Sequence, residues 1–331
     1  MIIVRTPYRV SFFGGMTDYP DWYEYHPGSV ISTTINKYSF IVIRKLPQVF
    51  DYKYRIRYYE VQETNSIDEI SIPVIRECLK FCNIDFGIDI THHGDLPNRT
   101  GIGSSSSFTV GLLHGLYTLT NQLKTKRQLA LDALYIEQKV LKQDVGSQDQ
   151  VAAAFGGFNK INFGGHQDFT VNPLILDSGI HRELESSMQM FHTQDCRESG
   201  QLAKKTIALL GQQEKKLQDM NALTDRAQSI LFDANQNRLT DFAEALNEQW
   251  ILKKAIQPES TNQKIDEIYD RALTAGALGG KLLGAGGGGF MLFVTPLDAK
   301  QKVEEALGLT SVPILFEYLG SQIIYYDNQD R

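Results

Sequence analysis

The sequence predicts an α+β protein of two domains that share a cleft. Its 331 residues exceed the ~100–200 residues of a typical single core. The first half alternates between strand-like and helix-like segments, whereas the chain from about 197 to 276 is rich in Gln, Lys, Leu and Ala at helical spacing. Because the composition changes near residue 180, we expect an N-terminal domain over 1–176 and a C-terminal domain over 187–331.

Composition narrows the class of protein. With 42% hydrophobic residues, 22% charged residues and a net charge of -6, the chain resembles neither a disordered protein nor one that binds nucleic acid. No apolar run approaches the ~18 residues of a membrane span, and Met1–Val10 contains two arginines with no apolar stretch after it. We therefore expect a cytoplasmic protein without membrane contact, and the sequence leaves its oligomeric state open.

Strands and helices alternate through the first domain. Val, Ile, Phe and Tyr dominate the segments that we interpret as strands, and Pro73 opens a helix with apolar residues at helical spacing. A longer helix is predicted from Ser104 to Leu119, where apolar residues form one stripe and Gly111 and Gly115 allow close packing. The predicted strands span 2–5, 8–13, 28–46, 52–61 and 86–92.

Capping residues mark two more helices. Thr125–Gln128 reads as a capping box for a helix that continues to about Leu141, and Ser147–Gln150 reads as another for a short helix that stops at Gly156. The remaining elements are predicted strands at 158–163 and 168–176, at least three helices between 197 and 276, a helix at 298–307, and strands at 313–318 and 321–326.

Familiar nucleotide-binding motifs fail when their context is tested. Gly284–Gly289 matches G-x-G-x-x-G, but a dinucleotide fingerprint opens a helix, and this segment runs into the strand-like FMLFV. Gly276–Leu282 is one residue short of a Walker A loop and lacks the Ser or Thr that should follow the lysine. The protein-kinase runs H-R-D, D-F-G and A-P-E do not occur in the sequence.

The segment LPNRTGIGSSSSF, Leu96–Phe108, predicts a phosphate-binding loop. Gly101 and Gly103 permit a tight turn that exposes backbone amides at the open end of a helix, and such an end attracts phosphate. The serine hydroxyls add donors for phosphate oxygens and neutral ligands for Mg²⁺. A merely well-capped core helix needs only one serine, so we favour phosphate binding. The serines are Ser104, Ser105, Ser106 and Ser107.

Phosphoryl transfer also needs a carboxylate for the metal and one near the attacking hydroxyl. The candidates are Glu137, in the middle of a predicted helix, and Asp149, in the first turn of the next helix. Taken alone, Glu137 is better explained as an exposed helical residue, and Asp149 as an ordinary residue of a first helical turn.

Arg9 and Asp18 flank the glycine pair Gly14-Gly15 near the N-terminus. A glycine pair within an apolar strand indicates a bulge or a close approach of two backbones, which would direct the following polar residues into a cleft. Asp18 could then bind sugar hydroxyls, and a simple Thr-Asp turn is an equally good explanation.

Together these segments resemble the GHMP kinase superfamily, which includes galactokinases, homoserine kinases and mevalonate kinases. Its three motifs occur in order as Arg5–Pro20, Leu96–Ser107 and Lys281–Val294, and the resemblance covers nearly the whole chain. Pro7–Ile41 is similar to the bacterial sugar kinases typified by D-glycero-D-manno-heptose 7-phosphate kinase. The resemblance implies an N-terminal domain like the second domain of ribosomal protein S5 and a C-terminal ferredoxin-like domain, with the active site between them.

The resemblance further implies an ATP- and Mg²⁺-dependent kinase that phosphorylates the anomeric hydroxyl of a sugar phosphate. Heptose 7-phosphate, converted to the 1,7-bisphosphate, is the first choice of acceptor. Ser105 and Glu137 would hold Mg²⁺, Asp149 and Arg9 would be the catalytic pair, and Asp18 would bind sugar hydroxyls. Gly101, Gly103, Ser104, Ser105, Ser106 and Ser107 would hold the ATP phosphates, and Gly14, Gly15, Gly286, Gly287 and Gly288 would approach the sugar.

Two alternatives stay open. The acceptor could be a neutral sugar such as fucose, galactose or mannose, or the protein could be a catalytically silent sensor of sugar or nucleotide. The presence of the metal and catalytic candidates favours an enzyme, and Thr17-Asp18-Tyr19 suits a polyol better than an isoprenoid precursor. A phosphorylated acceptor requires further positive charge, for which the candidates are His26, Lys37, Arg99 and Arg197.

Overall fold

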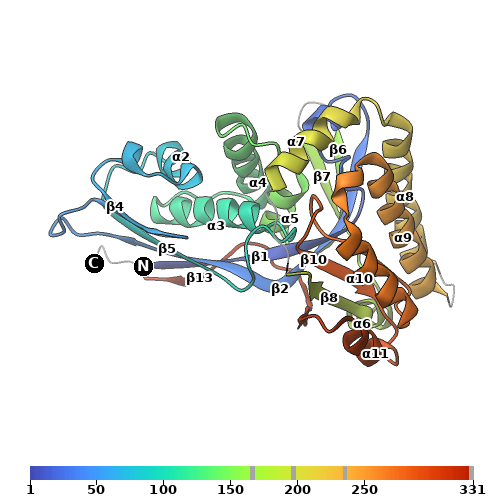
Figure 1. Cartoon of the computed structure of the whole chain (residues 1–331). Helices are drawn as coiled ribbons and strands as arrows, with labels where there is room; N and C mark the ends of the chain where they lie inside the picture. Colours follow the sequence, from blue (N-terminus) through green and yellow to red (C-terminus); the bar gives the residue numbers. More distant parts are fainter. Residues whose placement is uncertain (165–167, 195–198, 234–236, 328–331) are drawn as a thin grey trace.

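A computed structural model describes residues 1–164, 168–194, 199–233 and 237–327, and within them two sheets are flanked by helices (Figure 1). No helix in this part of the chain is both long and apolar enough to cross a membrane. The strands are β1 (Ile2–Phe13), β2 (Gly28–Lys45), β3 (Tyr54–Arg57), β4 (Val61–Thr64), β5 (Ile88–Gly94), β6 (Phe158–Gly164), β7 (Asp168–Pro173), β8 (Met188–His192), β9 (Gly279–Leu282), β10 (Phe290–Val294), β11 (Ser311–Val312), β12 (Phe316–Glu317) and β13 (Gln322–Tyr326). The helices are α1 (Pro20–Tyr23), α2 (Pro73–Phe81), α3 (Ser104–Leu119), α4 (Lys126–Leu134), α5 (Gln148–Phe155), α6 (Ser178–Ser187), α7 (Ser199–Leu210), α8 (Glu214–Phe232), α9 (Arg238–Ile256), α10 (Gln263–Thr274) and α11 (Lys300–Leu307).

The first sheet is built around β2, which pairs with β1 along one edge and with β6, β12 and β5 in turn along the other. Helix α3 packs on this sheet through the two glycines predicted to allow close contact. A Cβ atom at Gly111 would lie 2.6 Å from Thr6 Oγ1, and one at Gly115 would lie 2.5 Å from Ile43 Cδ1. The glycines therefore bring the helix, and the loop before it, close to β1.

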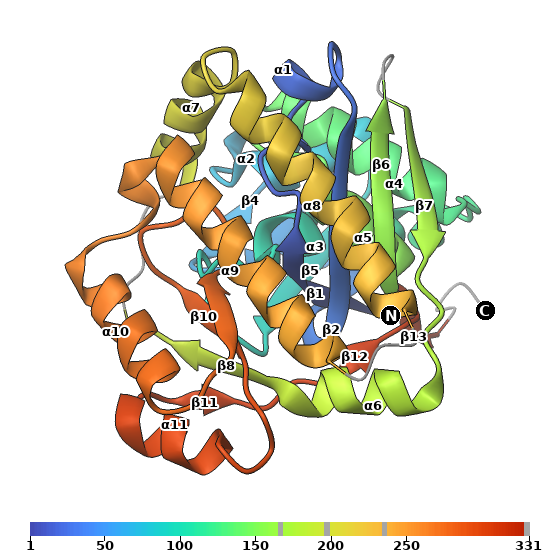
Figure 2. The ribbon, with the colours of Figure 1, turned by 90° about the vertical axis from the view of Figure 1, so that its right-hand side faces the viewer.

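The second sheet has the strand order β11-β8-β10-β9, and its neighbours are antiparallel. Along the chain, β8 is followed by helices, then by β9 and β10, then by α11 and β11. This βαββαβ arrangement is ferredoxin-like, as predicted. Figure 2 shows α8 and α9 lying side by side across a face of the first sheet, so the helical insert after β8 covers β1 and β2.

An apolar core joins the two parts of the molecule. Phe12 and Phe13, at the end of β1, make edge-to-face contacts with Phe242 of α9, with ring centroids 5.6 and 5.1 Å apart. The chain also returns to its beginning, because β13 pairs with β1 and β12 pairs with β2. The division into 1–176 and 187–331 stays a prediction, and it did not anticipate that the last strands join the first sheet.

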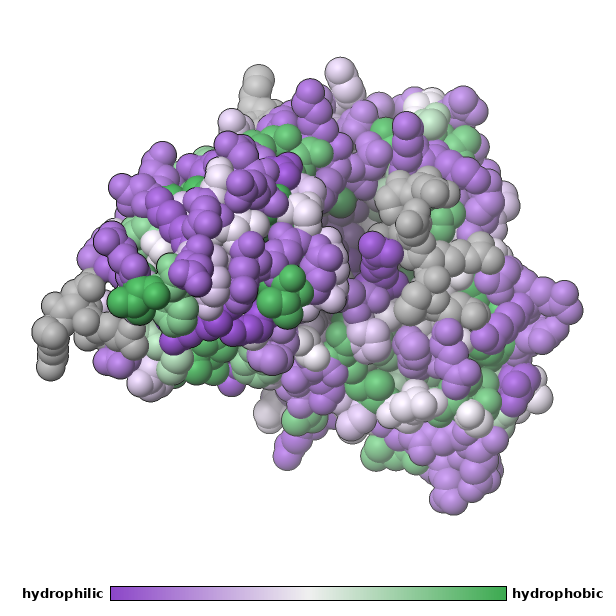
Figure 3. Space-filling view, turned by 60° about the vertical axis from the view of Figure 1, so that its left-hand side comes forward, coloured by the Kyte–Doolittle hydropathy of each residue, from purple (hydrophilic) through white to green (hydrophobic). Residues whose placement is uncertain are grey.

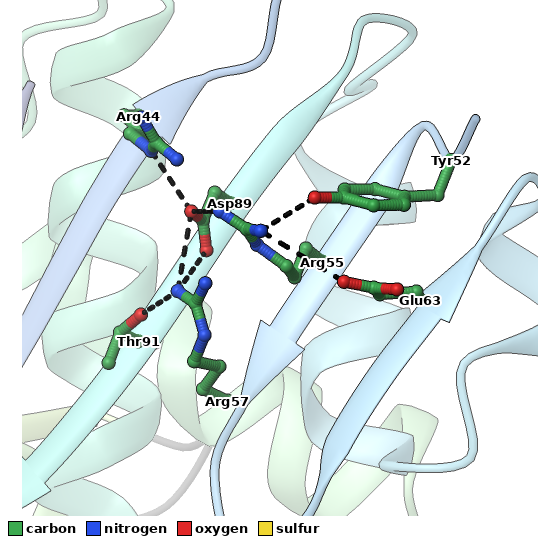
Figure 4. Close-up of polar contacts among 7 residues, drawn as sticks. All are labelled: Arg44, Tyr52, Arg55, Arg57, Glu63, Asp89 and Thr91. Carbon is green, nitrogen blue, oxygen red and sulfur yellow. Dashed lines mark hydrogen bonds and ion pairs between the residues drawn. The ribbon is translucent and has the colours of Figure 1, made fainter. Parts of the chain in front are cut away.

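A cluster of arginines surrounds one buried carboxylate on the first sheet (Figure 4). Asp89 of β5 accepts hydrogen bonds from Arg44 of β2 at 2.9 Å, and from Arg55 and Arg57 of β3 at 2.9 and 3.0 Å. Burial alone would raise the pKa of Asp89, but the hydrogen bonds from Arg55 and Arg44 hold the pKa below its usual value. The cluster ties together the strands beside β5, which leads into the predicted phosphate-binding loop.

We expect Asp89→Asn to lower the free energy of unfolding by about 2–4 kcal/mol, because it removes the negative charge that three arginines share. Urea unfolding at pH 7 measures the loss. Glu63→Gln is the matched control, since Glu63 lies 4.0 Å from Arg55 with its side chain 46% exposed, and an exposed pair contributes at most about 1 kcal/mol. Because the pKa of Asp89 is lowered, its contribution should fade as the pH falls through that pKa. Equal stability of the two variants would contradict this account.

Candidate active site

The predicted phosphate-binding loop lies directly before α3. Gly101 and Gly103 have φ angles of 82° and 73°, a conformation that favours glycine. A Cβ atom at Gly101 would lie 2.4 Å from the carbonyl oxygen of Leu283, so the loop packs against the chain that follows β9. No side chain caps the first turn of α3, and its amides are therefore available to an anion.

The four serines of the loop have different surroundings. Ser104, Ser105 and Ser106 line a cavity beside the loop. The hydroxyl of Ser107 instead donates to the carbonyl oxygen of Pro7 at 2.8 Å. Ser107 therefore fixes α3 to β1, and it is not among the residues that line the cavity.

Glu137 lies in a π-helical turn, Tyr135–Val140, that continues α4. The sequence predicted an uninterrupted helix here, but π-helical turns are frequent at functional sites. The buried Oε2 of Glu137 accepts hydrogen bonds from the Ser106 hydroxyl at 2.9 Å and from the side chain of Gln150. Sequence analysis paired Glu137 with Ser105, whereas the structure brings the neighbouring Ser106 against it and leaves Ser105 exposed.

The second oxygen of Glu137, Oε1, is buried and has no hydrogen-bond partner among the described residues. Burial raises the pKa of Glu137, and hydrogen bonding by the side chains of Thr109, Gln150 and Ser106 only partly offsets this effect. A buried carboxylate with an unpartnered oxygen, next to a serine hydroxyl, fits a pair of Mg²⁺ ligands.

Arg9 and Asp149 form an ion pair beside the loop. Arg9 Nε and Nη2 both contact Asp149 Oδ1, at 2.8 and 2.7 Å. Arg9 Nη1 donates to the carbonyl oxygen of Gly101 at 2.6 Å. The arginine side chain is 5% exposed, whereas the Asp149 side chain is 24% exposed. The guanidinium is thus fixed between the loop and α5, and the carboxylate is open to the cavity.

Asp18 is buried against the start of α5. Its Oδ1 accepts from the Met16 amide at 3.1 Å, and its Oδ2 accepts from the Gln148 amide at 3.3 Å. Its carbonyl oxygen accepts from the Ser147 amide at 2.8 Å. The predicted capping box at Ser147 is wrong, because that side chain makes no cap and its hydroxyl contacts the Tyr23 hydroxyl at 3.0 Å. Asp18, from a distant segment, supports the start of α5 instead.

The predicted glycine pair has two functions in the structure. Gly15 lines the cavity. Gly14 supports it from behind, because a Cβ atom at Gly14 would lie 1.8 Å from the carbonyl oxygen of Ser29. Gly14 has a φ angle of 78°, which favours glycine, and the absence of a side chain lets the two segments of the chain approach this closely.

In the third motif the cavity is lined by Gly284 and Ala285, and the structure does not bring Gly286–Gly288 to it. Within that triplet, Gly287 donates its amide to the carbonyl oxygen of Ser260 at 2.9 Å. A Cβ atom at Gly284 would lie 2.3 Å from the Cα atom of Gly101. The second and third motifs therefore interlock through glycines, and the next residues pack against the segment after α9.

These segments enclose one cavity of about 380 Å³, a size typical of small-molecule sites. The surface view shows a hollow between the two parts of the molecule, bordered by hydrophilic side chains (Figure 3). Sequence analysis missed several lining residues, because their place beside the cavity depends on contacts between distant segments. These residues include Tyr58, Tyr59 and Asn98 on the side of the first sheet, and Gln249, Lys253 and Lys281 on the side of the second.

The four basic residues predicted for a second phosphate are scattered. Arg99 lines the cavity. His26 stacks on Trp22 with ring centroids 4.2 Å apart, and neither His26 nor Lys37 is a lining residue. Arg197 lies outside the described residues.

Comparisons with known proteins agree with this geometry. Residues 71–157 match the family of GHMP kinase N terminal domains, and residues 231–310 match that of the C terminal domains. The D-glycero-alpha-D-manno-heptose 7-phosphate kinase of Campylobacter jejuni is 31% identical over 92% of this chain and 93% of its own length. A galactokinase of Pyrococcus furiosus is 26% identical over 96% of this chain and 94% of its own. The crystal structure of a D-glycero-D-manno-heptose 1-phosphate kinase from Bacteriodes thetaiotaomicron superimposes with a TM-score of 0.79 at 25% identity, covering 98% of this chain and 100% of that one.

The fold, the loop and the relatives define a phosphotransferase whose acceptor is a hydroxyl group. The chain belongs to the GHMP kinase family, within which it is a sugar kinase with ATP as co-substrate. The predicted family, fold class and enzyme class are thereby confirmed.

The burial of Asp18 can be tested through the pH dependence of the protein's stability. Burial raises this pKa to about 6, and the charge of Asp149 adds to the effect. The native state therefore holds the Asp18 proton up to a higher pH than the unfolded state does. The stability that the bound proton contributes is lost as the pH rises through about 6. Between pH 5 and pH 8, the unfolding free energy of Asp18→Asn should gain about 1 kcal/mol relative to the native protein. Urea unfolding at both pH values measures this gain, and parallel pH profiles would contradict the assignment.

Proposed function

We propose that this sugar kinase transfers the γ-phosphate of Mg·ATP to the anomeric hydroxyl of D-glycero-D-manno-heptose 7-phosphate and forms the 1,7-bisphosphate. The observation that carries the proposal is the convergence of Arg9, Asp149 and Asp18 with the serine loop in one cavity. Two relatives named for heptose phosphates support the choice of sugar, although their names place the phosphate at different positions.

ATP would bind with its phosphates against the amides at the start of α3 and the hydroxyls of Ser104, Ser105 and Ser106. Mg²⁺ would be held by Glu137 and by Ser106 or Ser105, with phosphate oxygens completing its shell. When bound, the ion neutralises charge on the β- and γ-phosphates. The buried Oε1 of Glu137 supports this assignment, because it makes no hydrogen bond of ordinary geometry with the described residues.

Arg9 and Asp149 would act on the two reacting groups. The Arg9 guanidinium bonds to Gly101 of the loop and to Asp149, so its charge would lie beside a phosphate bound at the loop. The Asp149 carboxylate would orient the anomeric hydroxyl and accept its proton. Phosphoryl transfer passes through a loose transition state, so little proton removal is needed early, and an ordinary aspartate suffices. Asp18 would hold sugar hydroxyls.

A neutral sugar is the second candidate acceptor. A galactokinase is among the relatives, with 26% identity over nearly the whole chain. A carboxylate such as Asp18 can select a neutral sugar by hydrogen bonds alone. Fucose, galactose and mannose are the sugars to test against the heptose phosphate.

Replacing Asp149 by Asn should lower kcat by about 10²–10⁴-fold, because a general base contributes a factor of this size. Binding of ATP should change little, since the Asn side chain remains next to Arg9 and the loop is untouched. Steady-state kinetics give kcat, and calorimetry with a non-hydrolysable ATP analogue gives binding. A kcat near that of the native enzyme would mean that another group accepts the proton.

The acceptor itself is tested by kcat/KM for heptose 7-phosphate, unphosphorylated heptose, mannose, fucose and galactose. We expect at least a tenfold preference for the phosphorylated heptose, because charge-assisted hydrogen bonds to phosphate are about twice as strong as neutral ones. NMR of the product gives the position of the new phosphate, which should be C1. Preference for a neutral sugar would refute the phosphorylated acceptor, and phosphate at another carbon would refute the anomeric assignment.

A further inference from the structure

Two buried lysines face the cavity without a carboxylate partner. Lys253 of α9 and Lys281 of β9 are 6% and 4% exposed, and both line the cavity. Lys253 Nζ donates to the carbonyl oxygen of Gly284, and Lys281 Nζ donates to that of Phe12 at 2.8 Å. Neither has an ion pair with a carboxylate within the described ranges. An ammonium group has three N–H donors, so each lysine retains donors for a ligand.

Burying an unpaired ammonium is unfavourable, and the protein shows this cost. Burial lowers the pKa of Lys253 to about 7, and the charge of Arg9 adds to the effect. Burial also lowers the pKa of Lys281 strongly, with further contributions from Lys253 and Arg9 and an opposing one from Asp18. Lys253, Lys281 and Arg9 all line the same cavity, as does Arg99. An anion entering the cavity would relieve the repulsion and restore the lysine charges.

The bonds of the two lysines place them between the loop and the sugar-binding segment. Lys253 binds the carbonyl of Gly284, which packs on Gly101 of the loop. Lys281 binds Phe12 of β1, the strand that leads to Gly15 and Asp18. The loop already offers its amides and the hydroxyls of Ser104 and Ser105 to the phosphates of ATP, because the Ser106 hydroxyl donates to Glu137. Asp18, by contrast, offers only a carboxylate to the acceptor.

We propose that Lys253 and Lys281 together bind the phosphate group that the acceptor already carries, and so select a phosphorylated sugar over its neutral counterpart. This inference rests on the proposed sugar-phosphate kinase activity. The phosphates of ATP offer the same oxyanion chemistry, and the experiment separates these two sources. A purely structural role, in which the lysines only tie backbone segments together, is the other outcome that the experiment distinguishes.

Lys253→Met and Lys281→Met keep the length of the side chain and remove its charge. For each variant we expect KM for heptose 7-phosphate to rise about tenfold or more, the effect of one charged hydrogen bond. KM for unphosphorylated heptose and KM for ATP should change less than about threefold. Lys300→Met is the matched control, because Lys300 makes a similar bond to the carbonyl of Met188 at 3.1 Å but does not line the cavity. It should leave all three constants unchanged.

A second measurement needs no variant. Near pH 8 a lysine with a pKa of about 7 is mostly neutral, and a bound phosphate should raise that pKa and draw a proton from the buffer. Calorimetry of heptose 7-phosphate binding, in buffers with different ionisation enthalpies, should show net proton uptake. Unphosphorylated heptose should show none.

The outcomes separate the possibilities. The lysine site would be overturned if the lysine variants raised KM equally for both heptoses, or raised only KM for ATP. It would also be overturned if heptose 7-phosphate bound without proton uptake. A native enzyme that prefers heptose 7-phosphate, with lysine variants that keep this preference, would overturn the inference and leave the proposed function standing. A native enzyme that prefers a neutral sugar would refute the proposed acceptor itself.

Discussion

The Arg9 guanidinium holds together the three segments from which the site is built. It bonds to Asp149 at the start of α5 and to Gly101 in the loop, while the Arg9 amide donates to the carbonyl oxygen of Ile102 at 3.0 Å. Charge-assisted hydrogen bonds in a buried setting are strong. In the proposed function, the carboxylate and the positive charge would therefore be in position before a substrate binds, and such preorganised charge is usually the largest contribution to transition-state stabilisation.

Close glycine contacts and an apolar core extend this geometry to the second part of the molecule. Gly284 fits against Gly101 only because neither has a side chain. Behind this contact, Phe12 of β1 packs against Phe242 of α9, so the strand that carries Arg9 and the helix that carries Lys253 share one core. Buried residues of both parts of the molecule belong to this core, among them Phe12, Phe242 and Leu283. The two walls of the cavity thus form one unit, and the distance between them is set by packing.

Local sequence patterns were sufficient where the signal lies within one segment. Helix α3 begins at Ser104 and ends at Leu119 as predicted, because two glycines, the serines and the apolar stripe follow one another directly. Contacts between distant segments could not be predicted in this way. The serine beside Glu137 is Ser106 and not Ser105, a difference of about 100° around the helix that depends on how α3 docks on β1. The cap of α5 likewise comes from Asp18, which is 130 positions away from Gln148.

The lining lysines that the sequence did not indicate share a physical cause. Lys253 and Lys254 are neighbours with the same side chain, yet Lys253 is buried, whereas Lys254 forms an ion pair with Asp266 at 3.1 Å. Lys281 lies in a four-residue strand in which every residue is buried. Sequence patterns place charged residues outside because burial of an unpaired charge destabilises the free protein. Other buried charges, such as Asp89 and Lys160, lie away from the cavity and are paired with opposite charges. Lys253 and Lys281 differ from them, because they are buried without a carboxylate partner and line the cavity. If the proposed ligand supplies that partner, the departure of these two lysines from the pattern has a functional cause.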